Sequence, residues 1–145
     1  MEVAWVRRGG VRGVQPARLT PFVQRAARLA GCPGEALTVV LSSDAELRSL
    51  NRKWRGRDRP TDILSFPGGP EPDGTHSQGE LIISVDTARR QAASRHHPLA
   101  TELRYLLLHG LLHLMGFDHE TDGGEMETEE RRLRAALLRP RRRRG

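Results

Sequence analysis

Three histidines in the last third of the chain have the type and spacing of metal ligands. Residues 103–115 are almost all apolar, which predicts a buried helix, yet His109 and His113 interrupt this run four positions apart. At ~3.6 residues per turn, this spacing puts both imidazoles on one face of the helix, about one turn apart. Gly116 is suited to end the helix in a left-handed conformation, so that the chain turns back and brings His119 toward the same point. Three neutral imidazoles are typical Zn²⁺ ligands and leave a fourth position for water, which predicts a catalytic metal site with one zinc per chain.

Two other interpretations of these histidines stay open on the residues alone. A structural metal would have a fourth protein ligand, and a pair of core histidines would need no metal, since backbone groups can satisfy them. The spacing equals that of the metzincin peptidases, H-E-x-x-H-x-x-G-x-x-H, except that Gly110 stands where those enzymes have the glutamate that acts as general base. The pattern therefore predicts their metal scaffold without their proton acceptor. Asp118 is a candidate to hydrogen-bond a ligand imidazole, and equally a candidate to cap backbone amides of the turn.

Hydrophobic periodicity and capping residues predict the elements that must position the histidines. Thr20 is expected to cap a first helix with Pro21 in its first position, and Ser43 to cap a second, with Glu46 three residues later. Apolar and β-branched runs predict strands at residues 3–6, 37–41, 61–66 and 80–85. Further helices are predicted over residues 86–97 and 99–115 and from the acidic stretch 122–130 onward. These elements predict an α+β fold in which the histidine-bearing helix packs on a small mixed sheet.

The composition is typical of one soluble domain. A length of 145 residues allows a single hydrophobic core, which we expect over residues 1–138, followed by a disordered basic tail over 139–145. The formal net charge is +6, but Arg139 and Arg141 to Arg144 supply five of these charges, so the excess lies mainly in the tail. No run approaches the ~18 apolar residues that span a bilayer, and the N-terminus lacks a signal-peptide pattern, which predicts a cytoplasmic protein with no membrane partner.

A second basic region lies at the end of the predicted second helix and in the loop that follows it. Six cationic residues fall within twelve positions, a density that suits a ridge for phosphate groups: Arg48, Arg52, Lys53, Arg55, Arg57 and Arg59. The alternative is a solvated charged face, which is the commoner fate of a run of charges.

Four segments of the chain form a distinctive set: Leu50-Asn51-Arg52 with Trp54-Arg55-Gly56, then Arg59-Pro60-Thr61-Asp62-Ile63-Leu64-Ser65-Phe66-Pro67, then Gly79-Glu80-Leu81-Ile82-Ile83-Ser84, and the eleven-residue histidine motif. In these segments the chain resembles the bacterial YbeY proteins, rRNA maturation factors described as metal-dependent endoribonucleases with a zincin-like α+β fold. One position departs from the family pattern, because Glu80 stands where the family usually has aspartate.

The resemblance implies that His109, His113 and His119 bind zinc and that Arg59 is the catalytic arginine of RNA cleavage. A guanidinium suits this role, since its planar fork of donors can hold two non-bridging phosphate oxygens as charge develops on them. The implied activity is that of an endoribonuclease, a hydrolase that acts on single-stranded RNA in 16S rRNA 3′ end maturation and ribosome quality control. The implied partners are RNA and the ribosome or its small subunit, and no oligomeric state is implied. Two alternatives are a zinc hydrolase of another substrate, such as a peptide, and a noncatalytic ribosome assembly factor with a structural zinc.

Overall fold

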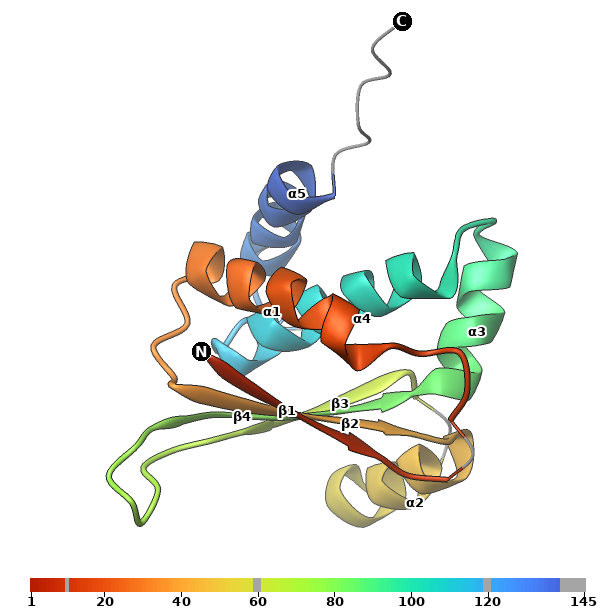
Figure 1. Cartoon of the computed structure of the whole chain (residues 1–145), viewed down its shortest axis with the longest axis horizontal. Helices are drawn as coiled ribbons and strands as arrows, with labels where there is room; N and C mark the ends of the chain where they lie inside the picture. The colour runs from red at the N-terminus through yellow and green to blue at the C-terminus, as the bar shows by residue number, and fades with distance from the viewer. Residues whose placement is uncertain (10, 59–60, 119–120, 139–145) are drawn as a thin grey trace, which may run out of the picture.

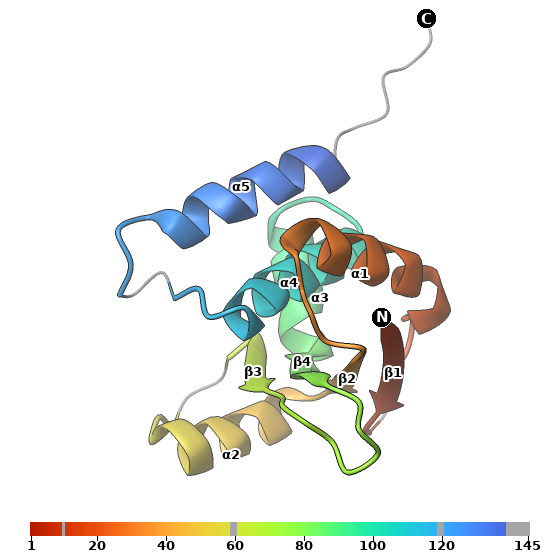
Figure 2. The same cartoon turned by 90° about the vertical axis from the view of Figure 1, so that its left-hand side faces the viewer.

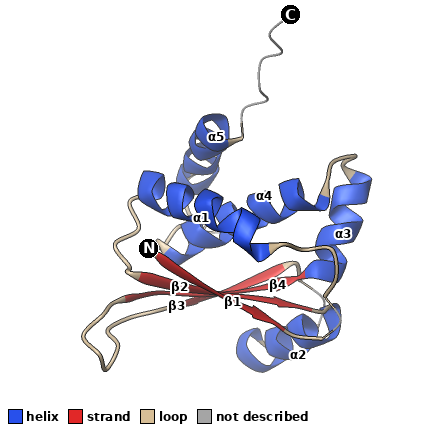
Figure 3. Ribbon diagram, in the orientation of Figure 1, coloured by secondary structure: helices blue, strands red, loops and turns tan. Residues whose placement is uncertain are grey.

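Strands and helices alternate in the first half of the chain, and three helices follow one another at its end, as the sequence predicts (Figures 1 and 3). The computed structural model describes residues 1–9, 11–58, 61–118 and 121–138. The elements are β1 (Glu2–Arg7), α1 (Pro16–Ala30), β2 (Ala36–Ser42), α2 (Asp44–Arg55), β3 (Ile63–Pro67), β4 (Ser77–Ser84), α3 (Val85–Ser94), α4 (Leu99–Leu114) and α5 (Glu125–Leu137). The predicted tail over residues 139–145 lies outside the described residues. No helix among the residues described has the length and apolar character needed to span a membrane.

The four strands form one mixed sheet in the order β1-β2-β4-β3. β1 pairs with β2, and β2 with β4, in parallel, whereas β3 and β4 form an antiparallel pair. Helices α1 and α4 cover one face of the sheet with α5 beyond them, and α2 lies on the opposite face (Figures 1 and 2). The domain is therefore α+β with a small mixed sheet, and its edge strand β3 lies between α4 and α2.

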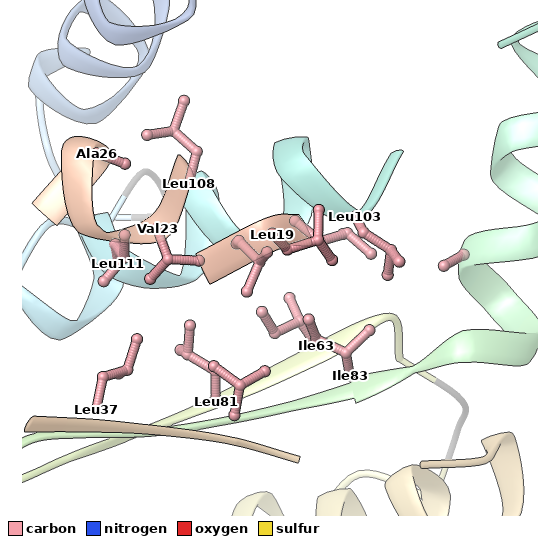
Figure 4. Packing of buried hydrophobic residues seen from close by; sticks show 14 of the residues in the cluster. Leu19, Val23, Ala26, Leu37, Ile63, Leu81, Ile83, Leu103, Leu108 and Leu111 are labelled. Atoms are coloured by element: carbon pink, nitrogen blue, oxygen red, sulfur yellow. The ribbon is translucent and has the colours of Figure 1, made fainter. Parts of the chain in front are cut away.

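The main core lies between the sheet and the two helices α1 and α4 (Figure 4). Leu103, Leu108 and Leu111 of α4 meet residues of α1 such as Val23 and residues of the sheet such as Leu81, all of them almost completely buried. Burial of large aliphatic side chains contributes roughly 1.5–3 kcal/mol for each. The apolar run that predicted a buried helix thus anchors α4 over the sheet.

The start of α1 differs from the prediction. The helix begins with Pro16 rather than Pro21, since the missing N–H of a proline is harmless at either first position and Pro16 comes first in the chain. Thr20 is not the N-cap. Its hydroxyl donates to the Pro16 carbonyl at 3.3 Å and accepts from Trp5 Nε1 at 2.9 Å. A tertiary contact with β1 therefore takes the side chain that local spacing had assigned to capping.

Two caps hold α2 and α3 in place. The Ser43 side chain accepts from Glu46 N at 3.4 Å, which confirms the predicted cap of α2. α3 begins at Val85, one residue before its predicted start, and is capped by Ser84, because β4 runs directly into the helix and the Ser84 hydroxyl accepts from Thr87 N at 3.2 Å.

Asp44, the first residue of α2, joins this helix to the junction between β4 and α3. Its carboxylate accepts from Ser84 Oγ at 2.5 Å, Thr87 Oγ1 at 2.6 Å and Arg90 Nη2 at 2.7 Å. Burial opposes ionisation of this group, but the three hydrogen bonds and the Arg90 charge outweigh it and lower the pKa of Asp44 to about 2. The hydrogen bonds to Asp44 therefore anchor the first turn of α2.

Candidate active-site cleft

A cleft of about 740 Å³ opens along the edge strand β3, between α4 and the end of α2. His109 and His113 line it from α4, Asn51 and Arg55 from α2, and Arg57 from the loop after α2. Figure 2 shows β3 between these two helices. Elements that are far apart in the sequence thus bring two imidazoles and two guanidinium groups to one cleft.

The two histidines have the geometry of ligands that share one metal ion. His109 Nε2 and His113 Nε2 lie 3.0 Å apart, and the ring planes are inclined by 80°. Two nitrogen ligands ~2.0–2.1 Å from a tetrahedral zinc lie about 3.3 Å from each other, so a small adjustment would let both rings bind one ion. Among the residues that the structure describes, no group of three possible metal ligands comes together. His119, the third predicted ligand, lies outside the described residues.

Glu130 of α5 supports His109 from the side away from His113. Glu130 Oε1 lies 3.0 Å from His109 Nδ1 and accepts a hydrogen bond from Arg134 Nη2 at 3.2 Å. Burial opposes ionisation of Glu130, but its hydrogen bonds with His109 and Arg134 and the charge of Arg134 outweigh it, so the pKa of Glu130 lies below its ordinary value. An ionised carboxylate can only accept. It therefore holds the proton on Nδ1 and leaves the Nε2 lone pair directed into the cleft, as a metal ligand requires.

The sequence prediction missed Glu130, although the sequence contains a signal for it. Met126 and Leu133 are the buried residues of α5, and Glu130 lies four positions after the first and three before the second. It therefore occupies the face of the helix that turns toward the core. An acid on such an apolar face needs a polar partner, which here is His109 of the neighbouring helix α4.

Gly110, the position that distinguishes the motif from the peptidase pattern, lies where α4 approaches the sheet. A Cβ atom at this position would lie 2.8 Å from Ile63 Cδ1 and 2.8 Å from Leu81 Cδ2. A glutamate there would point into packed core rather than into the cleft. The glycine thus permits the close packing of α4 on the sheet and excludes the peptidase base from this fold.

The carboxylates of the sequence motifs are distributed unequally around the cleft. Asp62 lines it, and its Oδ2 accepts from Gln91 Nε2 at 3.3 Å. Asp118 also lines it, whereas Glu80 lies opposite Phe66 in the β4–β3 register, on the sheet face that α2 covers. Neither role expected for the Asp118 carboxylate is tested, so both stay predictions.

The predicted basic ridge divides into two parts. Arg55 and Arg57 line the cleft, while Arg48 forms an ion pair with Asp58 at 2.9 Å outside it. Arg59 lies outside the described residues, and its predicted role is therefore untested.

The fold and the cleft define a small α+β protein with a candidate metal centre of paired histidines beside basic side chains. The endoribonuclease YbeY family matches residues 17–137, and the chain belongs to this family. The family match confirms the resemblance inferred from the sequence motifs.

Individual relatives agree with this assignment. The chain is 46% identical over 128 residues to the endoribonuclease YbeY of Koribacter versatilis, a match that covers 88% of this chain and 81% of the relative. It is 40% identical over 127 residues to the endoribonuclease YbeY of Aquifex aeolicus, with 88% and 84% covered. The solution structure of TM1509 from Thermotoga maritima superposes with a TM-score of 0.60 at 26% identity, covering 94% of this chain and 89% of that one.

Proposed function

We propose that this chain is a zinc-dependent endoribonuclease with a zincin-like fold that cleaves single-stranded RNA in the cleft beside β3. The observation that carries the proposal is the 3.0 Å approach of His109 Nε2 to His113 Nε2 in a cleft that Arg55 and Arg57 also line. Imidazole nitrogens suit zinc, and guanidinium groups suit phosphates. His119 completes the proposed ligand set with one zinc per chain.

Each side chain has a distinct task in this proposal. A zinc bound by the histidines would act as a Lewis acid toward the phosphodiester and its attacking water. Glu130 keeps His109 in the tautomer with a free Nε2. Arg55 and Arg57 bind phosphates of the RNA strand, and Arg59 donates to the non-bridging oxygens on which charge develops.

The proton acceptor must come from another element than α4, because Gly110 has no side chain and its surroundings leave no room for one. Asp62 and Asp118 are carboxylates that line the cleft. The same packing at Gly110 disfavours a peptidase of the metzincin type, which has its base at this position.

The names of the relatives support RNA as substrate, and the resemblance of the motifs points to an rRNA precursor. On that resemblance, we propose a role in 16S rRNA 3′ end maturation and in ribosome quality control, which implies the ribosome or its small subunit as partner and the cytoplasm as location. We further propose that residues 1–138 form the hydrolase domain and that the tail over 139–145 adds nonspecific affinity for RNA, since it contains five of the arginines.

The decisive experiment measures cleavage of a defined single-stranded RNA by highly purified protein. We expect metal-stripped protein and His113→Ala to be inactive. Arg59→Ala should keep its zinc and its fold but lose roughly 10²–10³-fold in cleavage rate, the usual effect of removing one donor aimed at developing charge. Arg59→Lys should recover only part of this loss, because an ammonium restores the charge without the bidentate fork.

Arg59→Ala separates the nuclease from a noncatalytic assembly factor, since loss of a ligand would disable every zinc hypothesis alike. Wild-type cleavage rates in Arg59→Ala, with no cleavage by His113→Ala, would rule out the arginine-assisted mechanism. If wild type, His113→Ala and metal-stripped protein all cleaved the RNA at the same rate, the cleavage would come from a contaminating ribonuclease. That result would rule out the proposed nuclease activity of this chain.

A further inference from the structure

A large aromatic side chain is exposed at the end of α2, close to the cleft. Trp54 is 62% exposed, against 39% for Leu29 and 38% for Val6 among the other exposed large apolar residues described. Its ring packs edge-to-face on Phe66 with centroids 6.5 Å apart, and Lys53 Nζ lies 5.1 Å from its centroid. The indole is thus held in place at one edge while most of its surface faces solvent.

Trp54 lies directly beside the cleft. Arg55, the next residue, lines the cleft. Phe66, which supports the indole, lies on the same face of β3 as Leu64, and Leu64 also lines the cleft. A strand that passes along the cleft can therefore reach the indole at its rim.

The surroundings of Trp54 are strongly basic. Arg52, Lys53, Arg55 and Arg57 fall within six positions around it. Within the described residues, the acids at the other end of α2 are engaged elsewhere: Asp44 pairs with Arg90 and Glu46 with Arg8. Cations at a helix C-terminus are favoured by the helix dipole, but the dipole gives no reason for an exposed tryptophan among them.

We propose that Trp54 stacks on an unpaired nucleobase of single-stranded RNA while the neighbouring cations bind the adjacent phosphates. The inference rests on the proposed nuclease function and adds to it a subsite outside the metal centre. Stacking on an aromatic ring tolerates every base, because every base has a π-face, and a nearby cation strengthens it. Bases within a duplex have no free face, so this subsite favours single strands.

A polyanion with exposed bases fits this surface better than a protein partner does. In the described part of the chain, the three exposed large apolar residues, Trp54, Leu29 and Val6, lie on α2, α1 and β1, and β1 and β3 are opposite edges of the sheet. They form no continuous apolar patch of the kind that protein interfaces use. Aromatic rings among cations are the usual arrangement of a single-strand binding groove, and Trp54 supplies one such ring.

The test compares binding of two 2′-O-methyl RNA probes of about twelve nucleotides, a uniform pyrimidine strand and its abasic counterpart, with zinc-loaded full-length protein. We expect Trp54→Leu, which keeps an apolar contact with Phe66 but has no π-face, to weaken binding of the base-containing strand roughly tenfold. Trp54→Phe should weaken it less than about threefold, because it keeps a smaller aromatic face. All variants should bind the abasic strand like wild type.

Leu29→Ala is the matched control, because Leu29 is also an exposed apolar residue but lies on α1, and it should bind both probes like wild type. RNA binding should quench the tryptophan fluorescence of wild type, and this quenching should be lost in Trp54→Phe. The other tryptophan, Trp5 of β1, donates a hydrogen bond to Thr20 of α1 and is not part of the proposed subsite. Thermal unfolding curves check that each variant is folded.

Two outcomes would overturn the subsite. In one, Trp54→Leu binds the base-containing strand as tightly as wild type. In the other, it weakens binding of both strands equally, which would make Trp54 a packing residue. Both outcomes leave the nuclease intact if wild type still cleaves single-stranded RNA in a zinc-dependent way, whereas absence of cleavage by wild type would contradict the proposed function itself.

Discussion

Replacing Glu130 by glutamine should weaken zinc binding without unfolding the protein. The substitution keeps the shape of the side chain but removes its charge, at a position where only 15% of the side chain is exposed. A glutamine amide can donate to His109 Nδ1, which a carboxylate cannot do. That alternative moves the imidazole proton to Nε2 and removes the lone pair that the metal needs.

The expected loss of zinc affinity is about 10–100-fold, the usual effect of removing a carboxylate that orients a ligand histidine. This corresponds to roughly 1.4–2.8 kcal/mol, which agrees with the ~1.5–3 kcal/mol of a hydrogen bond to a charged group. The 3.0 Å distance between Glu130 Oε1 and His109 Nδ1 and the shielding of the carboxylate favour a value inside this range.

Zinc affinity can be measured by competition with a chromophoric chelator, and the ligand geometry by the visible spectrum of the Co²⁺ form. Glu127→Gln is the matched control, since Glu127 lies on the same helix, pairs only with Arg131 among the described residues and is 73% exposed. It should change zinc affinity by less than about twofold. Wild-type zinc affinity in Glu130→Gln, together with lost affinity in His109→Ala, would show that Glu130 does not orient the ligand.

Three further predictions concern packing, pH and the tail. Gly110→Ala should lower the free energy of unfolding by about 1 kcal/mol in urea titrations. The added methyl group would lie 2.8 Å from Ile63 and Leu81, and the free-energy cost of this overpacking exceeds the gain from the higher helix propensity of alanine. A variant more stable than wild type would contradict this packing. Asp44→Asn should cost at most about 2 kcal/mol at pH 7. Folding lowers the pKa of Asp44 from its ordinary value of 3.8 to about 2, so this stabilisation is present above pH 3.8 and is lost as the pH falls toward 2. The difference in unfolding free energy between Asp44→Asn and wild type, measured in urea titrations, should therefore shrink over this range. A difference that does not change with pH would refute the role of the Asp44 charge. Removal of residues 139–145 should make the plot of log binding constant for RNA against log salt concentration shallower by up to about 3.5, since each of the five arginines contributes ~0.7 to its slope. The zinc content should stay unchanged. Loss of zinc would show that the tail is a structural element.

Several features of the site follow from local sequence alone. The four-residue spacing of His109 and His113 places both imidazoles on one helix face because helix geometry is local, and the structure confirms this. The cap formed by Ser43 and the left-handed Gly56 at the end of α2 are likewise interactions between residues near in sequence. The run Thr61-Asp62-Ile63-Leu64-Ser65-Phe66-Pro67 predicted a strand next to the site, and β3 is the strand that borders the cleft.

What the sequence misplaced or missed depends on partners distant along the chain. Thr20 was expected to cap α1, but its hydroxyl bonds to Trp5 of β1. Ser84 caps α3 while it also donates to Asp44, forty residues before it. Local propensities contain no information on such contacts, because the competing partner comes within reach only when the sheet has formed.

The sequence by itself determined the histidine pair, the strand beside it and the family, because each depends on residues that lie close together in the sequence at regular spacing. Only the tertiary structure decided that Glu130 would orient His109, 21 residues away, and that Gly110 is required by contact with Ile63 and Leu81. The same holds for Arg55, which lines the cleft because α2 packs on the opposite face of the sheet from α4, and for Trp54, whose ring packs on Phe66 of β3. Spacing along a helix sets the direction of a side chain, whereas packing between layers sets which groups it meets there.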